Sequence, residues 1–343
     1  MSNQQRNMHL EAARYLLFLG DVTEPGYAKT AFGLRDWATD RCLGELRLEG
    51  ATVSTGLSTL SPEEAAARGA TALVIGVAAP GGGIPIHWVP ALVAALEAGL
   101  DIVSGMHVSL SDIGALVVTA ARTGGRLINV RIPPSDIPIA SGLRRSGRRI
   151  LTVGTDCALG KKYAALAISR GLQQRGIDAE FRATGQTGIM LSGSGIPIDA
   201  VVSDFVAGAA ELLSPAANPD HIDVIEGQGS LFHPAYAGVS LGLLHGSQPD
   251  MFIVCHAPQR QHLLGFPTIP VPSLEAVIAQ TTVLGRVTNP AIRCVGIALN
   301  TGGMSQEAAD AEITALAARL PFPVSDPLRG GPSFERLLDA CVA

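Results

Sequence analysis

Short apolar runs alternate with helix-length stretches along nearly the whole chain, and this alternation constrains the fold more than any other feature. In the first part of the chain the apolar runs are 14–20, 71–77, 101–107 and 126–132, with helix-length stretches at 87–98 and 110–123. Strands that alternate with helices pack as a parallel sheet with crossover helices, and buried parallel strands read as continuous apolar runs. The pattern therefore predicts an α/β fold.

A segment rich in Pro, Ser, Gly and Arg, without periodicity, separates this part from a second alternation of the same kind. Strands are predicted there at 148–154, 178–184, 222–227, 251–257 and 292–300, and helices at about 160–175, 199–213, 235–245, 273–286, 305–319 and 332–341. A chain of 343 residues has room for two domains. We predict a first domain at 1–138 and a second at 139–343, each built on a parallel sheet.

Composition and charge exclude several classes of protein. Hydrophobic residues make up 47% of the chain and charged residues 16%, which favours buried cores and excludes a largely disordered chain. The net charge is -5 and no long basic block is present, so we expect no nucleic-acid partner. The uncharged stretch between Arg68 and Glu97 is interrupted by glycines and prolines, so we expect no membrane span.

The five cysteines form no CxxC pair, and the N-terminus has no signal-peptide pattern. These two features predict a reduced, cytoplasmic protein. The histidines form no metal-binding pattern, so no metal site is expected. We expect the partners to be small-molecule substrates and further copies of the chain in a homo-oligomer.

The stretch GTDCALGKK follows the strand predicted to end at Gly154 and precedes a predicted helix. A glycine-rich turn between a strand and a helix presents backbone N–H groups and the positive end of a helix dipole to a phosphate. The stretch is close to the P-loop pattern G-x-x-x-x-G-K-[ST]. We therefore predict a phosphate-binding loop made of Gly154, Thr155, Asp156, Cys157, Ala158, Leu159, Gly160, Lys161 and Lys162.

Lys162 stands where the P-loop pattern has the Ser or Thr that holds Mg²⁺. An ammonium group repels a cation, so the loop is expected to bind a diphosphate without metal. A nucleotide that is only held by its phosphates suits this site better than one that is cleaved. Coenzyme A is a molecule of that kind, because its chemistry takes place at a distant thioester. Cys157 is interpreted as a tolerated loop residue rather than a nucleophile.

Further polar residues follow the other predicted strands of the second domain. Glu226 ends one strand, where it serves either as a catalytic base or as the ion-pair partner of a loop lysine. His256 ends another strand, as a base or as an ordinary half-buried histidine. The candidates for substrate binding are Arg182, Gln186, Thr187 and Arg260.

The loop GTDCALGKK resembles the phosphate loop of dethiobiotin synthetase. Over nearly its full length, the chain resembles a family catalogued as a domain of unknown function. The motifs that carry this resemblance are GMHVSLSD, NVRIPP, GTDCALGKK, GQTG, SDFVAGAAE, IEGQGSLFHP, GLLHGSQPD and GIALNT. The resemblance implies a Rossmann-like N-terminal domain and a P-loop NTPase-like C-terminal domain. Within that family the chain is similar to the D-glutamate N-acetyltransferases of marine bacteria, which use acetyl-CoA in D-amino-acid catabolism.

This resemblance implies an acyltransferase that uses acetyl-CoA as co-substrate and needs no metal. Acetyl transfer needs a base that deprotonates the amine and donors for the thioester oxygen. We assign the base to Glu226 or His256 and the donors to the amides of 186–188. Carboxylate binding is assigned to Arg182 and Arg260. The alternatives are an ATP-dependent ligase or kinase of the dethiobiotin synthetase type, which Lys162 disfavours, and a nucleotide sensor without enzymatic activity.

Four arginines precede the strand of the phosphate loop: Arg144, Arg145, Arg148 and Arg149. They form either a solvated linker or, as a sharper hypothesis, a site in which one arginine binds the 3′-phosphate of coenzyme A.

Overall fold

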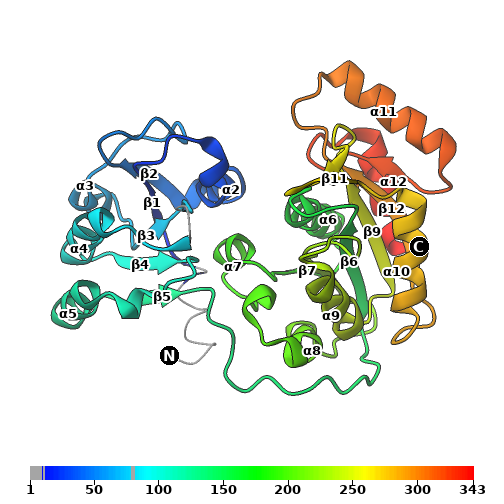
Figure 1. The fold of residues 1–343 in the computed structure, drawn as a ribbon, viewed down its shortest axis with the longest axis horizontal. Helices are drawn as coiled ribbons and strands as arrows, with labels where there is room; N and C mark the ends of the chain where they lie inside the picture. The colour runs from blue at the N-terminus through cyan, green and yellow to red at the C-terminus, as the bar shows by residue number, and fades with distance from the viewer. Residues whose placement is uncertain (1–9, 11, 79–81) are drawn as a thin grey trace. The chain divides into compact units, whose positions relative to one another are not determined.

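The structure is a computed structural model that describes residues 10, 12–78 and 82–343. The chain divides into two compact units (Figure 1). The N-terminal unit comprises the residues up to Pro133 together with Gln186–Pro197, and the C-terminal unit comprises Pro134–Gly185 and Ile198–Ala343. None of the described helices combines the length and the apolar character that a membrane span needs.

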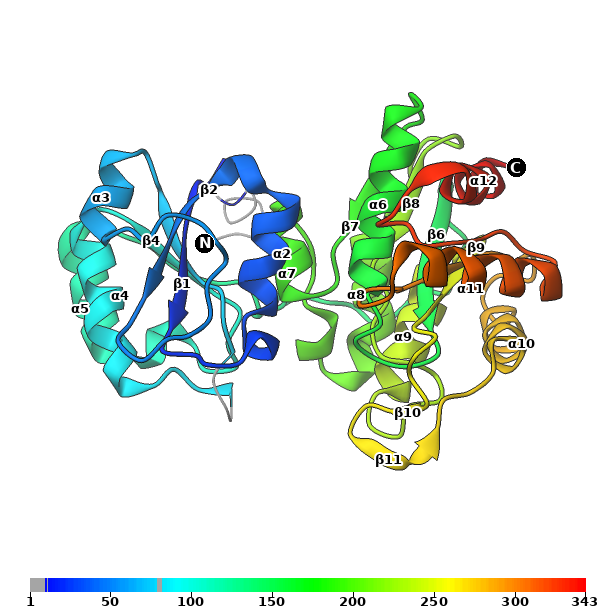
Figure 2. The same cartoon turned by 90° about the horizontal axis from the view of Figure 1, so that it is seen from above.

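The N-terminal unit is built on a parallel sheet with the strand order β2-β1-β3-β4-β5. Its strands are β1 (Tyr15–Gly20), β2 (Cys42–Arg47), β3 (Ala72–Ile75), β4 (Asp101–Ser104) and β5 (Leu127–Asn129). Its helices are α2 (Lys29–Trp37), α3 (Pro62–Ala67), α4 (Val89–Glu97), α5 (Gly114–Thr123) and α7 (Gln186–Ser192). Short 3-10 helices lie at Pro25–Tyr27, Thr39–Arg41, Ile86–Trp88 and Leu110–Asp112. Helices α3, α4 and α5 cover one face of the sheet, and α2 and α7 cover the other (Figure 2).

Helix α7 comes from the C-terminal half of the sequence but packs in the N-terminal unit. The Tyr15 hydroxyl donates a hydrogen bond to the carbonyl of Met190 at 3.1 Å. The Arg41 guanidinium donates to the carbonyls of Met190 at 3.1 Å and Leu191 at 3.0 Å. The segment Gln186–Pro197 is therefore part of the N-terminal unit, and the C-terminal unit begins at Pro134. The division into domains at 1–138 and 139–343 stays a prediction.

The C-terminal unit is built on a second parallel sheet with the order β13-β12-β9-β6-β8-β7. Its strands are β6 (Arg148–Gly154), β7 (Ala179–Arg182), β8 (Ile222–Ile225), β9 (Met251–His256), β12 (Arg293–Leu299) and β13 (Val324–Ser325). Its helices are α6 (Lys161–Gln174), α8 (Val206–Leu213), α9 (Ala237–Ser247), α10 (Leu274–Gly285), α11 (Gln306–Arg319) and α12 (Gly331–Val342), with 3-10 helices at Ile198–Ala200 and Ser203–Phe205. A separate antiparallel hairpin joins β10 (His262–Leu263) to β11 (Phe266–Pro270).

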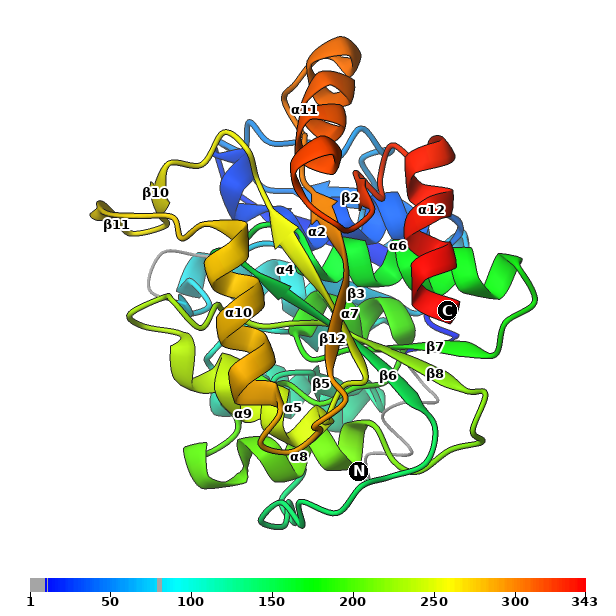
Figure 3. The ribbon, with the colours of Figure 1, turned by 90° about the vertical axis from the view of Figure 1, so that its right-hand side faces the viewer.

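The two faces of this sheet are covered by different helices (Figure 3). Helices α6 and α12 lie on one face, and α8, α9 and α10 lie on the other. The central strands are buried along most of their length, which is why they read as apolar runs. The predicted α/β class with two parallel sheets is confirmed.

The four arginines that precede the loop strand are structural. The Arg149 side chain is buried and donates to the Ser214 hydroxyl at 2.7 Å and to the carbonyls of Ser146 and Pro215 at 3.0 Å. Arg145 donates to the carbonyl of Ser214, Arg148 to that of Cys341, and Arg144 forms an ion pair with Asp250. They surround the amino end of β6, about 20 Å of strand away from the loop. These partners and this distance disfavour the hypothesis that one of them binds the 3′-phosphate of coenzyme A, which stays a prediction to be tested.

Candidate functional site

The topology of the C-terminal sheet brings the predicted site residues to one edge. From β6 the chain runs to β7 and β8 on one side and then to β9 on the other side. Strand β6 therefore lies where the strand order reverses, and the carboxyl ends of the strands at such a point are where ligands bind in open parallel sheets. Glu226 follows β8 and His256 ends β9, so the two predicted bases flank the loop that follows β6.

The loop 154–160 has the backbone that a phosphate nest needs. Ala158 has φ 53° and Gly160 has φ 94°, both in the left-handed region. A non-glycine residue rarely adopts this region, and such strain concentrates at functional sites. Within the described part of the chain, the amides of Ala158, Leu159 and Gly160 donate no hydrogen bond to the protein. These amides and the amino end of α6 are suited to bind an anion.

Lys161 places its ammonium group inside the loop. The side chain is buried, and its Nζ donates to the carbonyl of Asp156 at 2.7 Å. Burial lowers the pKa of Lys161, although the surrounding cysteines and Asp156 partly offset this. An ammonium group with little water around it attracts a phosphate more strongly than the ammonium group of an exposed lysine does.

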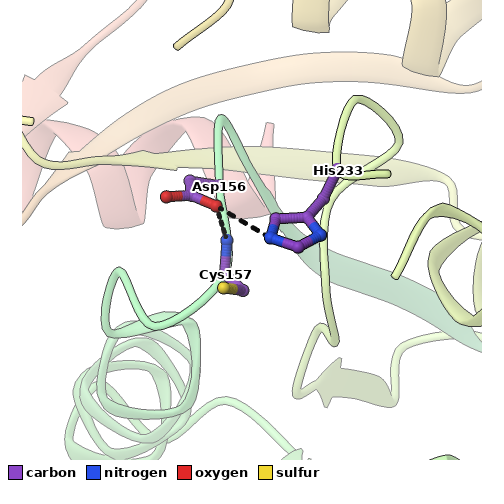
Figure 4. A group of neighbouring side chains, drawn as sticks. All are labelled: Asp156, Cys157 and His233. Atoms are coloured by element: carbon purple, nitrogen blue, oxygen red, sulfur yellow. Dashed lines mark hydrogen bonds and ion pairs between the residues drawn. The ribbon is translucent and has the colours of Figure 1, made fainter. Parts of the chain in front are cut away.

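Asp156 fastens the loop to the following hairpin. Its carboxylate is fully buried and accepts from the guanidinium of Arg260 at 2.8 Å and the amide of Leu264 at 2.9 Å. It also accepts from the amide of Cys157 at 2.6 Å (Figure 4). Burial opposes the charged form, but these donors outweigh it and hold the pKa of the Asp156 carboxyl below its usual value. Asp156 therefore contributes to a phosphate site through the backbone that it positions.

His233 was not predicted from the sequence, yet it lies beside the loop. It stacks on Tyr236 with ring centroids 4.5 Å apart, and its Nε2 lies 3.8 Å from a carboxylate oxygen of Asp156 (Figure 4). The Nδ1 accepts from the amide of Ala235 at 3.2 Å, and Nε2 donates to the carbonyl of Leu264 at 3.2 Å. In the sequence His233 is marked only by its place in the motif IEGQGSLFHP and by Tyr236 three positions later, and neither feature indicates a contact with the loop.

Asp156, Cys157 and His233 bring three potential ligand atoms within 4.8 Å of one another. Both ring nitrogens of His233 and both oxygens of Asp156 already take part in hydrogen bonds. Burial raises the pKa of Cys157, and Asp156 raises it further, so the sulfur stays a neutral thiol. These contacts fit an anchoring cluster better than a metal centre.

Glu226 lies buried between β7 and the loop. Its carboxylate accepts from the amides of Thr184 at 3.0 Å and Gly185 at 3.2 Å. Burial raises the pKa of Glu226, and Lys162 and these two amides offset the rise only in part. A Cβ on the next residue, Gly227, would lie 1.6 Å from the carbonyl of Thr152, so only glycine permits this approach to β6.

His256 lies on the other side of the loop. Its Nδ1 is 2.9 Å from the hydroxyl of Thr155, and the amide of Thr155 donates to the carbonyl of Cys255. Burial lowers the pKa of His256, and the charge of Arg319 lowers it further. The ring is therefore neutral at pH 7 and able to accept a proton.

Of the two arginines predicted to bind substrate, Arg260 contacts the loop and Arg182 does not. The guanidinium of Arg182 turns toward the amino end of its strand and forms ion pairs with Asp223 at 2.6 Å and Glu180 at 2.8 Å. Arg260 is held by Asp156 as described above. These partners account for both arginines without a substrate.

Gln186 and Thr187 open helix α7 of the N-terminal unit. The Thr187 hydroxyl lies 3.0 Å from that of Thr30, and the Gln186 side chain lies against Gly105. The role of both residues and of the amides 186–188 in binding substrate stays a prediction.

A shallow pocket adjoins the loop on the side of β12. Leu159, Gly160 and Tyr163 form one wall, and Asn300 and Leu328 form the other. Apolar walls with one amide group suit a flat heteroaromatic ring.

Comparisons with known proteins agree with this architecture. Residues 46–133 match the model of the DUF1611_N Rossmann-like domain, and residues 138–338 match that of the DUF1611_C P-loop domain, both described as domains of unknown function. A crystal structure of a DUF1611 family protein from Anabaena variabilis is 34% identical, covers 96% of this chain and 98% of its own, and superposes with a TM-score of 0.86.

Two curated relatives are similar over nearly their whole length. A D-glutamate N-acetyltransferase from Tritonibacter scottomollicae is 47% identical over 96% of this chain and 98% of its own. A D-glutamate N-acetyltransferase from a Pseudoalteromonas species is 46% identical over 92% of this chain and 96% of its own. The chain therefore belongs to the DUF1611 family, which joins a Rossmann-like domain to a P-loop domain.

Proposed function

We propose that this protein is an N-acetyltransferase that transfers the acetyl group of acetyl-CoA to the amino group of D-glutamate. Two relatives that share 46–47% identity with nearly the whole chain are D-glutamate N-acetyltransferases. This identity supports both the reaction and the amino acid. The identity of the acyl donor is the part of the proposal that rests on the site.

The observation that supports a coenzyme rather than a hydrolysed nucleotide is Lys162. It occupies the position of the metal-binding hydroxyl, and its charge lies close enough to Glu226 to lower the pKa of that buried carboxyl. A Mg²⁺ ion at this position would meet a cation. The loop amides and Lys161 suit the diphosphate of the coenzyme, and the pocket beside Asn300 suits its adenine ring.

Glu226 is the base that we assign to the reaction. The amino group of the substrate must lose a proton, its nitrogen forms a bond to the acyl carbon, and the carbon–sulfur bond breaks with the electron pair on sulfur. A carboxyl group whose pKa is raised by burial is a stronger base than a surface carboxylate. His256 is the second candidate, because it is neutral and also lies at the edge of the loop.

The test is to incubate the purified protein with acetyl-CoA and D-glutamate, and to follow the release of free thiol and the formation of N-acetylglutamate by mass spectrometry. L-glutamate serves as the matched control for stereochemistry. We expect turnover without ATP. A reaction that consumes ATP and requires Mg²⁺ would contradict the proposal and support the ligase alternative.

We further propose that the enzyme is a cytoplasmic homo-oligomer. The five cysteines are free thiols, and four of them are buried, which suits a reducing compartment. Light scattering coupled to size-exclusion chromatography tests the oligomeric state, and a monomeric mass would contradict that part of the proposal.

A further inference from the structure

A second, narrow pocket lies between the sheet and the helices α9 and α10 of the C-terminal unit. Its lining includes Gly154, the first residue of the phosphate loop, and Gly227, the residue after Glu226. It also includes Leu243 from α9 and Val277 and Thr281 from α10. The pocket therefore reaches from these two helices to the phosphate loop and to the residue that follows the assigned base.

The chemistry of the walls restricts what the pocket accepts. None of the residues that line it carries a charge. A dicarboxylate amino acid would lose its hydration there without gaining a counterion, so this substrate is excluded. A small uncharged group with an apolar end is favoured.

Thr281 adds one polar feature to these walls. The side chain is fully buried, and its hydroxyl has no hydrogen-bond partner among the described residues. Buried hydroxyls almost always have a partner, because an unsatisfied one is costly. Val277 lies one helical turn before Thr281 on the same face of α10. An uncharged ligand that carries a hydrogen-bond acceptor would satisfy the hydroxyl and contact Val277 at once.

We propose that this pocket receives the acyl-thioester end of the donor, with the Thr281 hydroxyl donating to the thioester carbonyl and Val277 limiting the length of the acyl chain. The inference rests on the proposed acetyl transfer and names the residues that select the donor. A donor to the carbonyl oxygen stabilises the negative charge that develops there during transfer.

Thr281→Val tests the hydrogen bond, because valine keeps the shape and removes the hydroxyl. We expect kcat/KM for acetyl-CoA to fall about 10- to 100-fold, with KM for D-glutamate unchanged and the melting temperature unchanged or raised. Thr282→Val is the matched control, because the Thr282 hydroxyl donates to the carbonyl of Ile278 at 2.8 Å within the same helix. This control should keep the kinetics of the wild type.

Val277→Ala tests the length limit. We expect the ratio of kcat/KM for butyryl-CoA to that for acetyl-CoA to rise at least tenfold, because the smaller side chain admits the longer chain. The inference would be overturned if Thr281→Val keeps the kcat/KM of the wild type for acetyl-CoA and Val277→Ala keeps its ratio of kcat/KM for butyryl-CoA to that for acetyl-CoA. A rise confined to KM for D-glutamate would overturn it too, because the pocket would then hold the amino acid.

Calorimetry separates this inference from the proposed function. The wild type should bind acetyl-CoA more tightly than CoA, and Thr281→Val should remove that preference. If the wild type transfers no acetyl group to D-glutamate but shows this preference, the acceptor is wrong and the pocket assignment holds. If it binds both molecules equally, the pocket assignment fails whatever the activity.

Discussion

The ion pair between Asp156 and Arg260 gives the sharpest test of how the loop is held. Arg260→Ala removes a guanidinium that reaches both the carboxylate of Asp156 at 2.8 Å and the carbonyl of Cys157 at 3.0 Å. If Arg260 binds the substrate, this change raises KM for D-glutamate. If it anchors the loop, as its contacts indicate, the change raises KM for acetyl-CoA and lowers stability.

The expected loss of stability follows from the burial of the two partners. The Asp156 side chain is fully buried, while 24% of the Arg260 side chain is exposed. Removing one partner of a buried pair costs about 3–5 kcal/mol, and partial exposure reduces this to about 2–4 kcal/mol. For a unit of roughly 200 residues this corresponds to a fall in melting temperature of about 4–16 °C. The amides of Leu264 and Cys157 still bond the carboxylate, so the loss stays in this range.

The lowered pKa of Asp156 also determines how this loss of stability depends on pH. The folded-state pKa of Asp156 is lowered, so the stability that it contributes is present above its unfolded pKa of about 4 and is lost as the pH falls through the folded value. The difference in melting temperature between wild type and Arg260→Ala should therefore be large at pH 7 and shrink below about pH 4.

Differential scanning fluorimetry across this pH range, combined with steady-state kinetics, measures both effects. Asp156→Asn and the double variant complete a thermodynamic cycle, and the double variant should lose less stability than the sum of the single variants. A melting temperature of Arg260→Ala within 1 °C of the wild type, or a rise in KM for D-glutamate alone, would refute the anchoring role.

Three further predictions concern the metal, the base and the arginines before β6. Activity should survive EDTA because Lys162 replaces the metal-binding hydroxyl, and activity that is lost on chelation and restored by Mg²⁺ would contradict this. With Glu226 as base, kcat/KM should rise with pH through a pKa above 4.5. Glu226→Gln should lower kcat/KM about 10²- to 10⁴-fold and abolish this rise with pH. If the variant keeps the rise, His256 is the base instead. Arg149→Met should cost about 3–5 kcal/mol of stability, because it removes the donor to the buried Ser214 hydroxyl and the donors to three partly buried carbonyls. The same variant should leave the ratio of KM for acetyl-CoA to that for its 3′-dephospho form unchanged, and a changed ratio would restore the phosphate-binding hypothesis.

The sheets could be predicted from the sequence because their central strands are buried on both faces. Strand β6 begins and ends where the apolar run predicts, and the other runs predict their strands to within about three residues. Strand β2 was missed because Glu45 and Arg47 interrupt the apolar pattern. The buried carboxylate of Glu45 accepts hydrogen bonds from the Ser54 hydroxyl and from the amide of Thr55. Both residues lie in the loop after the strand, and no sequence pattern marks them as partners of Glu45.

Helix α7 was missed for a related reason. It has seven residues and contains a glycine, so neither its length nor its composition indicates a helix. Its stability comes from partners more than a hundred residues away, such as Tyr15 and Arg41, which bond its carbonyls. Contacts of this kind depend on the tertiary fold and leave no periodicity in the segment itself.

In the candidate site, the backbone could be predicted from the sequence, and the partners of the side chains could not. A strand, a glycine turn and a helix determine where the loop lies and which amides it presents, and these features are local in the sequence. The partners of its charged side chains are not local, because Asp156 and Arg260 are 104 positions apart. A motif search therefore assigns every loop residue to the ligand and every nearby arginine to the substrate. A fully buried carboxylate such as Asp156 needs its own counterion, and Arg260 supplies it. A motif search does not include this requirement, so the binding of substrate by Arg260 stays a prediction that competes with an anchoring role.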